Sequence, residues 1–290
     1  MKILVTGGAG YIGSEIAKQL TWLKTISQVI VYDNFATGKH GLLQKGFNHA
    51  KLKIVKADIL DSRTLAKEIS GCSLVFHAAG VGSPINSNDF QIHQMEQVNH
   101  WGTAELVNLL ETHAPNARLI YLSTTEIENQ NNPSSYTSSI FRAEEEIDRL
   151  VKKNLASVLR VADVFGYSLN LRINTLLNKM ITDGFLLGKV QILGDGNQTV
   201  AFTSLDDILR AAEKAISNDF PAGTFNIVSH SATLNFVVQE LSSYLPQLET
   251  IYNAHHFTMD DRNVSNTIPC KIGNLTLGES IEQFLNRLKD

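Results

Sequence analysis

The stretch Lys2-Ile3-Leu4-Val5-Thr6-Gly7-Gly8-Ala9-Gly10-Tyr11-Ile12-Gly13 decides the fold. An apolar run of strand length leads into a glycine-rich turn, and a helical pattern of apolar residues follows. Gly7 permits a tight turn out of the strand, Gly10 lets the backbone approach a pyrophosphate, and Gly13 lets the helix pack closely on the strand. A pyrophosphate would then bind at the helix N-terminus, where N–H groups and the helix dipole favour an anion. The stretch therefore predicts a dinucleotide site.

A second apolar strand supports this interpretation. Val29-Ile30-Val31-Tyr32 leads directly to Asp33, twenty residues beyond Gly13. A carboxylate at that place can accept hydrogen bonds from both hydroxyls of an adenosine ribose and would repel a 2′-phosphate, which favours NAD over NADP. The alternative interpretation is a glycine turn in an α/β domain that binds no nucleotide, with Asp33 as a helix cap.

Strands and helices alternate along the first half of the chain. Further strand patterns occupy residues 51–57, 73–76, 119–122 and 158–161, and helical patterns occupy 64–69, 91–110 and 136–153. This alternation predicts right-handed βαβ units and a doubly wound parallel sheet of the Rossmann type, hence the α/β class. The rhythm loosens from about residue 166, which predicts a smaller C-terminal α/β substrate lobe. We therefore expect an NAD-binding domain over 1–165 and a substrate lobe over 166–290, some segments of which return to the first domain.

Composition describes an ordinary soluble globular protein. With 290 residues, 43% hydrophobic content and a net charge of -4, nothing suggests a nucleic acid or membrane partner. Cys72 and Cys270 are not spaced as a metal or redox pair, and the adjacent His255-His256 have no evident third ligand, so we expect no metal site. The first strand begins one residue after Met1, which leaves no room for a signal peptide, and no apolar run approaches the ~20 residues that span a bilayer. We expect a cytoplasmic protein.

These and further motifs resemble the extended short-chain dehydrogenase/reductase family, the NAD-dependent sugar-nucleotide epimerases, dehydratases and reductases. The resemblance covers most of the chain and implies a Rossmann domain followed by a substrate lobe. The motifs that carry it are Thr6 to Gly13, Asp33-Asn34 with Thr37-Gly38, Asp58-Ile59, His77-Ala78-Ala79-Gly80, Val98-Asn99 with Gly102-Thr103, Leu122-Ser123-Thr124, Tyr136, Leu159-Arg160 before Val164-Phe165-Gly166, Gly194-Asp195-Gly196, Asp206-Asp207 and Phe225-Asn226-Ile227.

The resemblance extends the set of cofactor-binding residues. Asp58 is expected to face the adenine amino group, and the segment Ala78-Ala79-Gly80 is expected to line the pyrophosphate and the nicotinamide side. The full predicted set for NAD is Gly7, Gly10, Tyr11, Ile12, Gly13, Asp33, Asn34, Thr37, Gly38, Asp58, Ile59, Ala78, Ala79, Gly80 and Asn99.

The catalytic pattern of the family is only partly present. In the family, a tyrosinate takes the proton of a substrate hydroxyl, a Ser or Thr hydroxyl holds the substrate oxygen, and a lysine four residues after the tyrosine lowers its pKa. Thr124 and Tyr136 fall at the first two positions, but Ile140 stands where the lysine belongs. A free tyrosine has a pKa of ~10, so without a nearby cation it is a poor base at neutral pH. Arg142 lies two residues further on, on another side of the helix, and does not replace the lysine.

Two further departures fall in the substrate lobe. After Gly194-Asp195-Gly196-Asn197-Gln198-Thr199 the family usually has an arginine that binds the substrate diphosphate, whereas this chain has Val200. The asparagine expected before the Val-Phe-Gly turn is Asp163, whose charge disfavours an anionic substrate nearby. The resemblance therefore implies intact cofactor contacts and eroded contacts to a nucleotide sugar.

Several of these residues also have a purely structural interpretation. Thr124 can be a strand-end cap, Tyr136 a buried aromatic at a helix start, and His77 a structural histidine at a strand end. The three glutamates 144–146 are interpreted as a solvated helix face.

Two hypotheses about function remain. In the first, the chain is an NAD-dependent epimerase, dehydratase or reductase that acts on a sugar, nucleotide sugar or related alcohol with Tyr136 working without the usual lysine. In the second, it is a non-catalytic NAD-binding sensor or scaffold. The retained Thr124 and Tyr136 favour the enzyme. The helices from Gln91 and from Tyr136 lie where related proteins pair, so we expect a homodimer.

Overall fold

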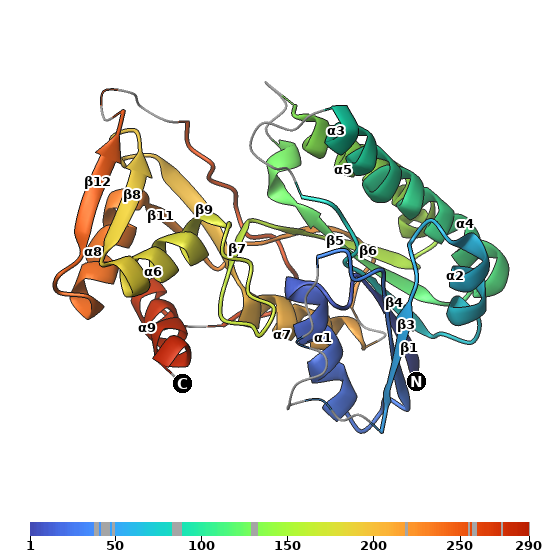
Figure 1. Ribbon diagram of the computed structural model, residues 1–290. Coiled ribbons are helices and arrows are strands. Elements are labelled where there is room, and N and C mark those ends of the chain that lie inside the picture. Colours follow the sequence, from blue (N-terminus) through green and yellow to red (C-terminus); the bar gives the residue numbers. More distant parts are fainter. Residues whose placement is uncertain are drawn as a thin grey trace. The chain divides into compact units, whose positions relative to one another are not determined.

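The computed structural model divides the chain into two compact units. Unit 1 consists of Met1–Arg160 and Ala212–Phe225, and unit 2 consists of Val161–Ala211 and Asn226–Asp290. The structure describes residues 1–37, 41, 47, 50–82, 89–128, 133–217, 220–254, 256, 260–273 and 275–289. One segment beyond the expected boundary at residue 165, Ala212–Phe225, thus belongs to unit 1 (Figure 1).

A seven-stranded sheet forms the centre of unit 1. Its strands, in chain order, are β1 (Lys2–Thr6), β2 (Gln28–Asp33), β3 (Leu52–Lys56), β4 (Leu74–His77), β5 (Arg118–Thr124), β6 (Ala156–Val161) and β10 (Gly223–Ile227). The spatial order is β10-β6-β5-β4-β1-β2-β3. The pairs β1–β2, β2–β3, β1–β4 and β4–β5 are all parallel. The doubly wound parallel sheet predicted from the sequence is therefore confirmed.

The spatial order of the strands reverses at β1, and the predicted dinucleotide site lies at this point of the sheet. The chain passes from β1 to β2 and β3 on one side of β1 and then crosses to β4 on the other side. Open α/β sheets bind their ligands at the carboxyl ends of the strands where the order reverses in this way. The register brings those ends together, since Thr6 lies opposite Tyr32 on one side and opposite His77 on the other. Asp33 follows Tyr32 directly, so the predicted ribose-binding carboxylate lies at this edge.

Helices cover both faces of the sheet of unit 1. They are α1 (Tyr11–Trp22), α2 (Ser62–Ile69), α3 (Asp89–Met95), the π-helical η2 (Glu96–Trp101), α4 (Gly102–His113), the 3-10 turn η3 (Thr125–Glu128) and α5 (Ser135–Lys152). Helix α1 covers one face, and α2, α4 and α5 cover the other (Figure 1). The single helix predicted over 91–110 is thus divided into three segments. At the division, the Thr103 hydroxyl donates to the Asn99 carbonyl, 2.6 Å away, and a bond of this kind loosens a helix locally.

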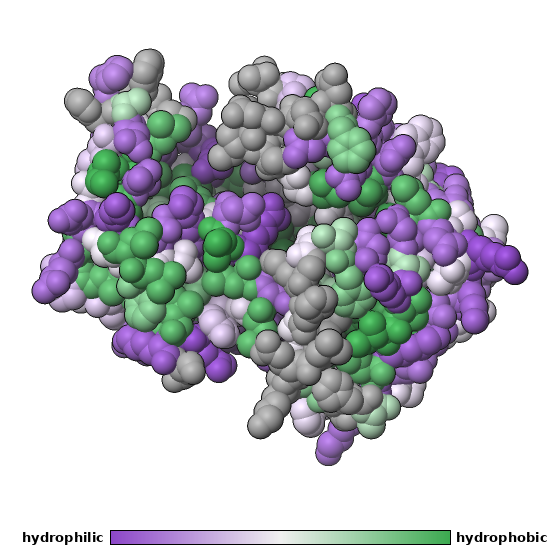
Figure 2. All heavy atoms as spheres, in the orientation of Figure 1, coloured by the Kyte–Doolittle hydropathy of each residue, from purple (hydrophilic) through white to green (hydrophobic). Residues whose placement is uncertain are grey.

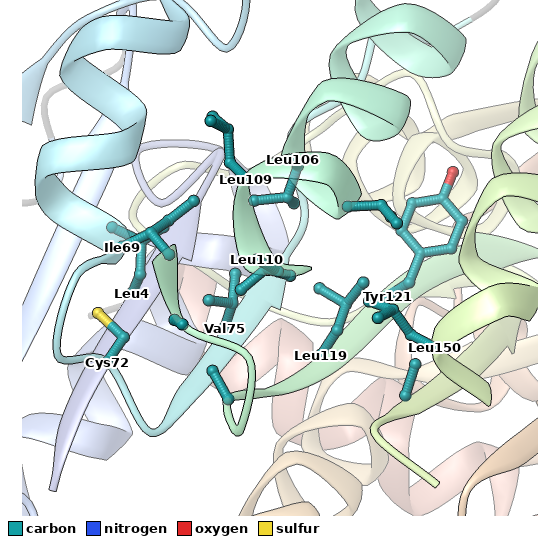
Figure 3. Packing of buried hydrophobic residues seen from close by; sticks show 14 of the residues in the cluster. Leu4, Ile69, Cys72, Val75, Leu106, Leu109, Leu110, Leu119, Tyr121 and Leu150 are labelled. Atoms are coloured by element: carbon teal, nitrogen blue, oxygen red, sulfur yellow. The ribbon is translucent and has the colours of Figure 1, made fainter. Parts of the chain in front are cut away.

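The main core of unit 1 lies between the sheet and the second of these helical layers. Leu4, Val75 and Leu119 reach it from the strands, and Leu106 and Leu150 reach it from α4 and α5 (Figure 3). Burying one such side chain stabilises the fold by about 1.5–3 kcal/mol. Parallel strands are covered on both faces, which explains why the strand segments are almost continuously apolar.

In the ranges that the structure describes, unit 2 contains two small sheets, three whole helices and the first part of α7, which continues into unit 1. A three-stranded sheet has the order β11-β9-β7, and β8 pairs with β12 in a two-stranded parallel sheet. The strands are β7 (Asp163–Phe165), β8 (Lys189–Leu193), β9 (Thr199–Ser204), β11 (His230–Thr233) and β12 (Glu249–Asn253). The helices are α6 (Leu176–Leu187), α7 (Leu205–Ala215), α8 (Leu234–Tyr244) and α9 (Leu277–Lys289).

The surface mixes charged and apolar side chains. Figure 2 shows hydrophobic side chains gathered over α6, where Leu186 and Leu187 are exposed. None of the helices in the described ranges has both the length and the apolar character to cross a membrane.

Candidate active site

The glycine turn is packed so closely that no side chain fits at two of its positions. Gly7 has a φ of +65°, and a Cβ there would lie 2.5 Å from the backbone nitrogen of Ala79. A Cβ on Gly13 would lie 2.3 Å from the Gly7 carbonyl oxygen. Strand β1, the segment after β4 and helix α1 therefore meet backbone to backbone. Gly7 thus makes the tight turn, and Gly13 the close packing of the helix, that the sequence predicted.

Helix α1 presents an open N-terminus at this turn. Its N-cap is Gly10, which has no side chain to cap the helix, and no acidic residue lies in the first turn. The backbone supports the turn, since Gly10 N–H donates to the Gly7 carbonyl at 3.0 Å. The N–H groups of a helix's first turn lack intrahelical acceptors and attract anions. Tyr11 and Ile12, both predicted to contact the cofactor, occupy this turn, and Tyr11 is buried.

Asp33 is held beside the glycine turn by two backbone donors. Ala9 N–H donates to its Oδ2 at 2.9 Å, and Phe35 N–H donates to its Oδ1 at 2.7 Å. A carboxylate has about four acceptor positions, so one on each oxygen stays available for a ribose hydroxyl. Phe35 itself has a φ of +59°, a strained value for a residue with a side chain. The bond from Phe35 to Asp33 is a feature that the sequence pattern did not show.

Asn34 and Asp58 bind each other at the same edge of the sheet. Asn34 Nδ2 donates to Asp58 Oδ2 at 2.8 Å, and the backbone N–H of Leu60 donates to Asp58 Oδ1 at 3.0 Å. The Ile59 side chain is buried in the core of unit 1, so only its backbone can face a ligand. Thr37 is exposed in the turn after β2, and Gly38 lies outside the described residues.

The buried imidazole of His77, at the end of β4, connects β1 to α4. His77 Nδ1 lies 2.6 Å from Thr6 Oγ1, and its Nε2 lies 2.8 Å from Thr103 Oγ1. Because the Thr103 hydroxyl donates its proton to the Asn99 carbonyl, it accepts from His77, which places the imidazole proton on Nε2. Burial lowers the pKa of His77 to about 3. His77 is thus a neutral structural residue, the interpretation that the sequence favoured.

Asn99 holds the segment that follows β4. Its Oδ1 accepts from Val81 N–H at 2.7 Å, and its Nδ2 donates to the Val81 carbonyl at 3.0 Å and to Ser139 Oγ at 3.1 Å. The side chain is almost fully buried. Since both ends of the amide are engaged with the protein, Asn99 supports the predicted cofactor segment Ala78-Ala79-Gly80 from behind.

The two predicted catalytic residues lie at the ends of neighbouring elements. Thr124 is the last residue of β5 and is nearly buried, and its Oγ1 accepts from Glu126 N–H at 3.2 Å. Tyr136 is the second residue of α5 and is half-buried. Burial, together with the charges of Tyr136 and Glu144, raises the pKa of Tyr121 on β5 well above its usual value. Helix α5 packs against β5.

No lysine replaces the missing cation on α5. Ile140, at the lysine position, is only 6% exposed. Arg142 forms an ion pair with Glu96 on η2, so its charge is engaged away from the Ile140 position. The position four residues after Tyr136 is therefore apolar and nearly dry.

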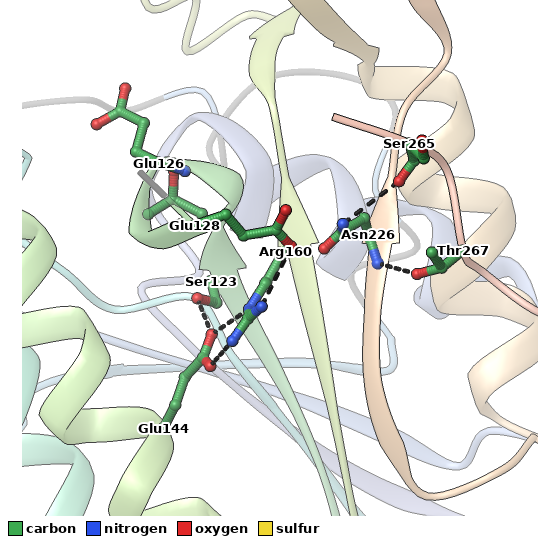
Figure 4. Close-up of polar contacts among 9 residues, drawn as sticks. Ser123, Glu126, Glu128, Glu144, Arg160, Asn226, Ser265 and Thr267 are labelled. Atoms are coloured by element: carbon green, nitrogen blue, oxygen red, sulfur yellow. Dashed lines mark hydrogen bonds and ion pairs between the residues drawn. The ribbon is translucent and has the colours of Figure 1, made fainter. Parts of the chain in front are cut away.

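The Glu144 side chain does not belong to a solvated helix face. The prediction of a solvated face for residues 144–146 is wrong at this position, because the Glu144 side chain is only 10% exposed. Arg160 Nη2 donates to its Oε2 at 2.6 Å, and Ser123 Oγ donates to its Oε1 at 2.5 Å (Figure 4). The helical pattern could not show this, because the partners of Glu144 lie on two strands.

The substrate-lobe departures are structural as well as chemical. Val200 is 1% exposed and packs in the core of unit 2. Asp163 accepts from the first two N–H groups of α6, with Leu176 N 3.2 Å from Oδ2 and Leu177 N 3.4 Å from Oδ1. Arg262, which is exposed, pairs with Val200 in an isolated β-bridge. No sequence motif indicated this arginine.

Metal chemistry has no support in the described ranges. There, no group of three or more His, Cys, Asp or Glu side chains is placed to hold a metal ion. Of the adjacent histidines 255 and 256, the first lies outside the described residues.

A glycine turn between a parallel strand and an open helix N-terminus, with a carboxylate at the end of the next strand, defines a dinucleotide-binding α/β protein. A family comparison makes this specific. The chain belongs to the NAD dependent epimerase/dehydratase family, whose model matches residues 3–228. The resemblance predicted from the motifs and the choice of NAD as cofactor are thereby confirmed.

Curated relatives show the same relationship. UDP-glucuronic acid decarboxylase 1 of Arabidopsis thaliana is 23% identical over 246 residues, covering 78% of this chain and 54% of the relative. A putative UDP-glucose 4-epimerase of Methanocaldococcus jannaschii is 29% identical over 234 residues, 74% of this chain and 73% of the relative. The chain spans about half the length of several curated relatives it matches.

Solved structures share the fold over the whole chain. The UDP-glucuronic acid 4-epimerase of Bacillus cereus, in complex with UDP-glucuronic acid and NAD, has a TM-score of 0.86 at 21% identity and covers 100% of this chain and 99% of its own. MoeE5 in complex with UDP-glucose and NAD has a TM-score of 0.79 at 21% identity, with the same coverage.

Proposed function

We propose that this chain is an NAD-dependent oxidoreductase of the epimerase/dehydratase type that acts on a sugar, a nucleotide sugar or a related alcohol. The observation that carries the proposal is the glycine turn, where a Cβ on Gly13 would collide with the Gly7 carbonyl while the α1 N-terminus stays free of acidic side chains. The residues present fit NAD, because the first turn of α1 has no acidic side chain to repel a pyrophosphate and the Asp33 carboxylate, held beside the turn, can accept from ribose hydroxyls.

Different residues of the chain bind different parts of NAD. The first turn of α1 binds the pyrophosphate, Asp33 binds the adenosine ribose, and Asp58, held by Asn34, faces the adenine. The segment Ala78-Ala79-Gly80, supported by Asn99, lines the nicotinamide side. NAD, when bound, supplies a hydride acceptor.

The remaining chemistry concerns one substrate hydroxyl. Thr124 donates a hydrogen bond to the substrate oxygen, and Tyr136, as the phenolate, takes the hydroxyl proton while the carbon gives up a hydride. The hydroxyl carbon is oxidised to a carbonyl, so the proton and the hydride are both accounted for. Because Ile140 supplies no cation to favour the phenolate of Tyr136, the reaction is expected to accelerate as pH rises.

The substrate class follows from similarity and from the departures in unit 2. One relative is a putative UDP-glucose 4-epimerase, and two structures with this fold contain UDP-glucose or UDP-glucuronic acid. In this chain Val200 offers no guanidinium, and Asp163 occupies the α6 N-terminus. We therefore propose a substrate that is held without an arginine at position 200.

A turnover experiment tests the proposal. Purified protein with NAD and a panel of UDP sugars, sugars and alcohols should develop absorbance of reduced nicotinamide or convert one sugar into its epimer. Tyr136→Phe should abolish the reaction while NAD binding persists. An unchanged rate in Tyr136→Phe would show that another group is the base.

Substitution at the lysine position sharpens this test. Ile140→Lys places an ammonium one helical turn from Tyr136 and should raise the rate about three- to tenfold at neutral pH and move the pH profile downward. The gain is modest because the position is buried, and burial disfavours a charged lysine. Ile140→Met, which adds length without charge, is the matched control and should leave the pH profile in place.

The second candidate is a non-catalytic NAD-binding sensor or scaffold. The buried, apolar Ile140 favours it, because a site without a cation near its tyrosine has lost a component of the reaction. On this alternative, neither the unmodified protein nor Ile140→Lys turns over any substrate, while both bind NAD.

Assembly and location complete the proposal. The helical layer formed by α3, η2 and α5 exposes Phe90, Trp101 and Phe141, with Trp101 58% exposed. Such a patch supports the homodimer expected from the resemblance. Light scattering at micromolar concentration should give twice the monomer mass, and Trp101→Glu combined with Phe141→Glu should give the monomer mass. We also propose that the chain acts in the cytoplasm, which cell fractionation can test.

A further inference from the structure

One buried carboxylate connects three elements around the predicted catalytic residues. Glu144 on α5 receives the hydroxyl of Ser123 on β5 at 2.5 Å, and Arg160 on β6 donates to it twice, from Nε at 3.0 Å and from Nη2 at 2.6 Å (Figure 4). The third guanidinium nitrogen, Nη1, donates to Glu128 at 3.3 Å. We call Ser123, Glu128, Glu144 and Arg160 the carboxylate clamp.

The burial and the two-point pairing of the clamp distinguish it from an exposed surface ion pair. The side chains of Glu144 and Arg160 are only 10% and 21% exposed. Their pairing uses the planar fork of arginine against both carboxylate oxygens, a geometry that fixes orientation as well as distance. Burial alone would lower the pKa of Arg160, but its hydrogen bonds and the charge of Glu144 raise it. A charge pair of this kind compensates for its desolvation only while both partners stay in place.

The clamp holds the chain on both sides of Thr124. Ser123 precedes Thr124 directly and binds Glu144, while Glu128 ends the η3 turn that follows Thr124 and binds Arg160. On α5, Glu144 lies eight residues after Tyr136, about 12 Å along the helix axis. The same carboxylate therefore ties the end of β5 to the helix that carries Tyr136.

We propose that Glu144, oriented by Arg160, is a positioning residue that sets the place of Thr124 relative to Tyr136. The inference rests on the proposed function, in which these two side chains must reach one substrate hydroxyl. Glu144 touches neither substrate nor cofactor in this role. It acts through Ser123 and through the seating of α5 on β5.

Two other roles make different predictions. If the clamp only stabilised the fold, its loss would lower the melting temperature and leave the rate per folded molecule unchanged. If Glu144 acted through its negative charge on Tyr136, its neutralisation would shift the pH profile to lower pH, because a nearby negative charge raises the pKa of a tyrosine. Positioning predicts a lower rate with an unchanged pH profile.

The test compares Glu144→Gln with Glu145→Gln, its exposed neighbour on the same helix. Active sites are counted by NAD titration, and kcat per site, KM and the pH profile are measured with the substrate found by the panel. We expect Glu144→Gln to lower kcat about 10- to 100-fold, since a displacement of 1 Å can cost that much, with the Kd for NAD within twofold and the pH midpoint unmoved. Ser123→Ala, which removes one hydrogen bond and no charge, should lower kcat in the same direction but less. An unchanged kcat per site or a shifted pH midpoint in Glu144→Gln would overturn the inference.

A second readout separates this inference from the proposed function. If the unmodified protein turns over no substrate, the proposed function fails, and the clamp is then tested by 19F NMR of 3-fluorotyrosine introduced at position 136 alone, with NAD present. Positioning predicts that Glu144→Gln and Ser123→Ala shift or broaden this resonance and that Glu145→Gln does not. A resonance that is the same in all four proteins would overturn the inference.

Discussion

Two helix N-termini in this chain have been given opposite environments. Helix α1 in unit 1 begins at Gly10, which has no side chain, and its first turn contains no acid. Helix α6 in unit 2 has its first two N–H groups bound to the carboxylate of Asp163. Both helices present the same backbone donors and the same dipole, so the difference lies only in the side chains around them. The first turn of α1 therefore has no carboxylate of its own chain, whereas that of α6 is bound by one.

The two units also differ in how far they keep the family pattern. In unit 1, Gly7 and Gly13 stand where a Cβ would collide with backbone atoms. In unit 2, Val200 packs in the core at the position where the family usually has an arginine, and Asp163 binds the start of α6.

Closing the open N-terminus should have the largest effect. Gly13→Val places a side chain where a Cβ already lies 2.3 Å from the Gly7 carbonyl oxygen, so α1 must move away from β1. We expect the affinity for NAD to fall about 1,000-fold or more, equivalent to about 4 kcal/mol. Isothermal titration calorimetry measures this directly.

A glycine elsewhere controls for the general cost of substitution. Gly188 at the end of α6 has a φ of +66° with nothing within 4 Å of its would-be Cβ. Gly188→Ala should destabilise the protein by about 1–2 kcal/mol through backbone strain and leave NAD affinity unchanged. Retained NAD affinity in Gly13→Val would remove the basis for treating α1 as the open site.

The support behind the open site should make stability depend on pH. The pKa of His77 is about 3 in the folded protein and 6.5 in a solvated imidazole. Between these values the unfolded chain binds a proton that the folded chain does not, so the free energy of unfolding falls as pH decreases from about 6.5 to about 3. The loss attributable to this group is several kcal/mol, on the order of 4.

Substitution isolates the contribution of His77 from that of the carboxylates. His77→Gln should show a flatter dependence of unfolding free energy on pH over this window, measured by urea denaturation. His113→Gln changes an exposed histidine and should follow the unmodified protein. Parallel curves for all three proteins would mean that His77 is not held neutral.

Cofactor choice should depend on the carboxylate next to the open site. The unmodified protein should bind NAD about 100-fold more tightly than NADP, because Asp33 repels a 2′-phosphate. Asp33→Asn keeps the shape of the side chain without its charge and should reduce this ratio about tenfold or more. Equal affinities for the two cofactors in the unmodified protein would refute the assignment of Asp33.

Opening the closed N-terminus should have the smallest effect. Asp163→Asn removes the negative charge at the start of α6 and should raise the affinity for UDP about tenfold, near the upper end of what a helix terminus contributes. The increase should weaken at high salt. Asp183→Asn, a change near the other end of the same helix, is the control, and an equal gain there would show a general charge effect.

The amino-acid sequence was sufficient to predict the fold of unit 1 and its glycine turn. Gly7 and Gly13 follow an apolar strand and lie where a Cβ would collide with backbone atoms, and the alternation of strands and helices predicted the Rossmann sheet. The resemblance to the family made the missing lysine visible, because Ile140 stands four residues after Tyr136. These features depend on residues close together in the sequence, so the sequence reveals them.

The hydrogen-bond partners of the polar side chains became known only from the tertiary structure. The sequence placed Glu144 among three solvated acids, whereas in the folded chain it binds Ser123 and Arg160, which lie on two strands. Asp163 caps a helix that begins thirteen residues later, a distance with no periodic signature. Hydrogen bonds of this kind depend on the packing of distant segments, and a carboxylate has the same appearance in a sequence whether it meets water, a guanidinium or a helix N-terminus.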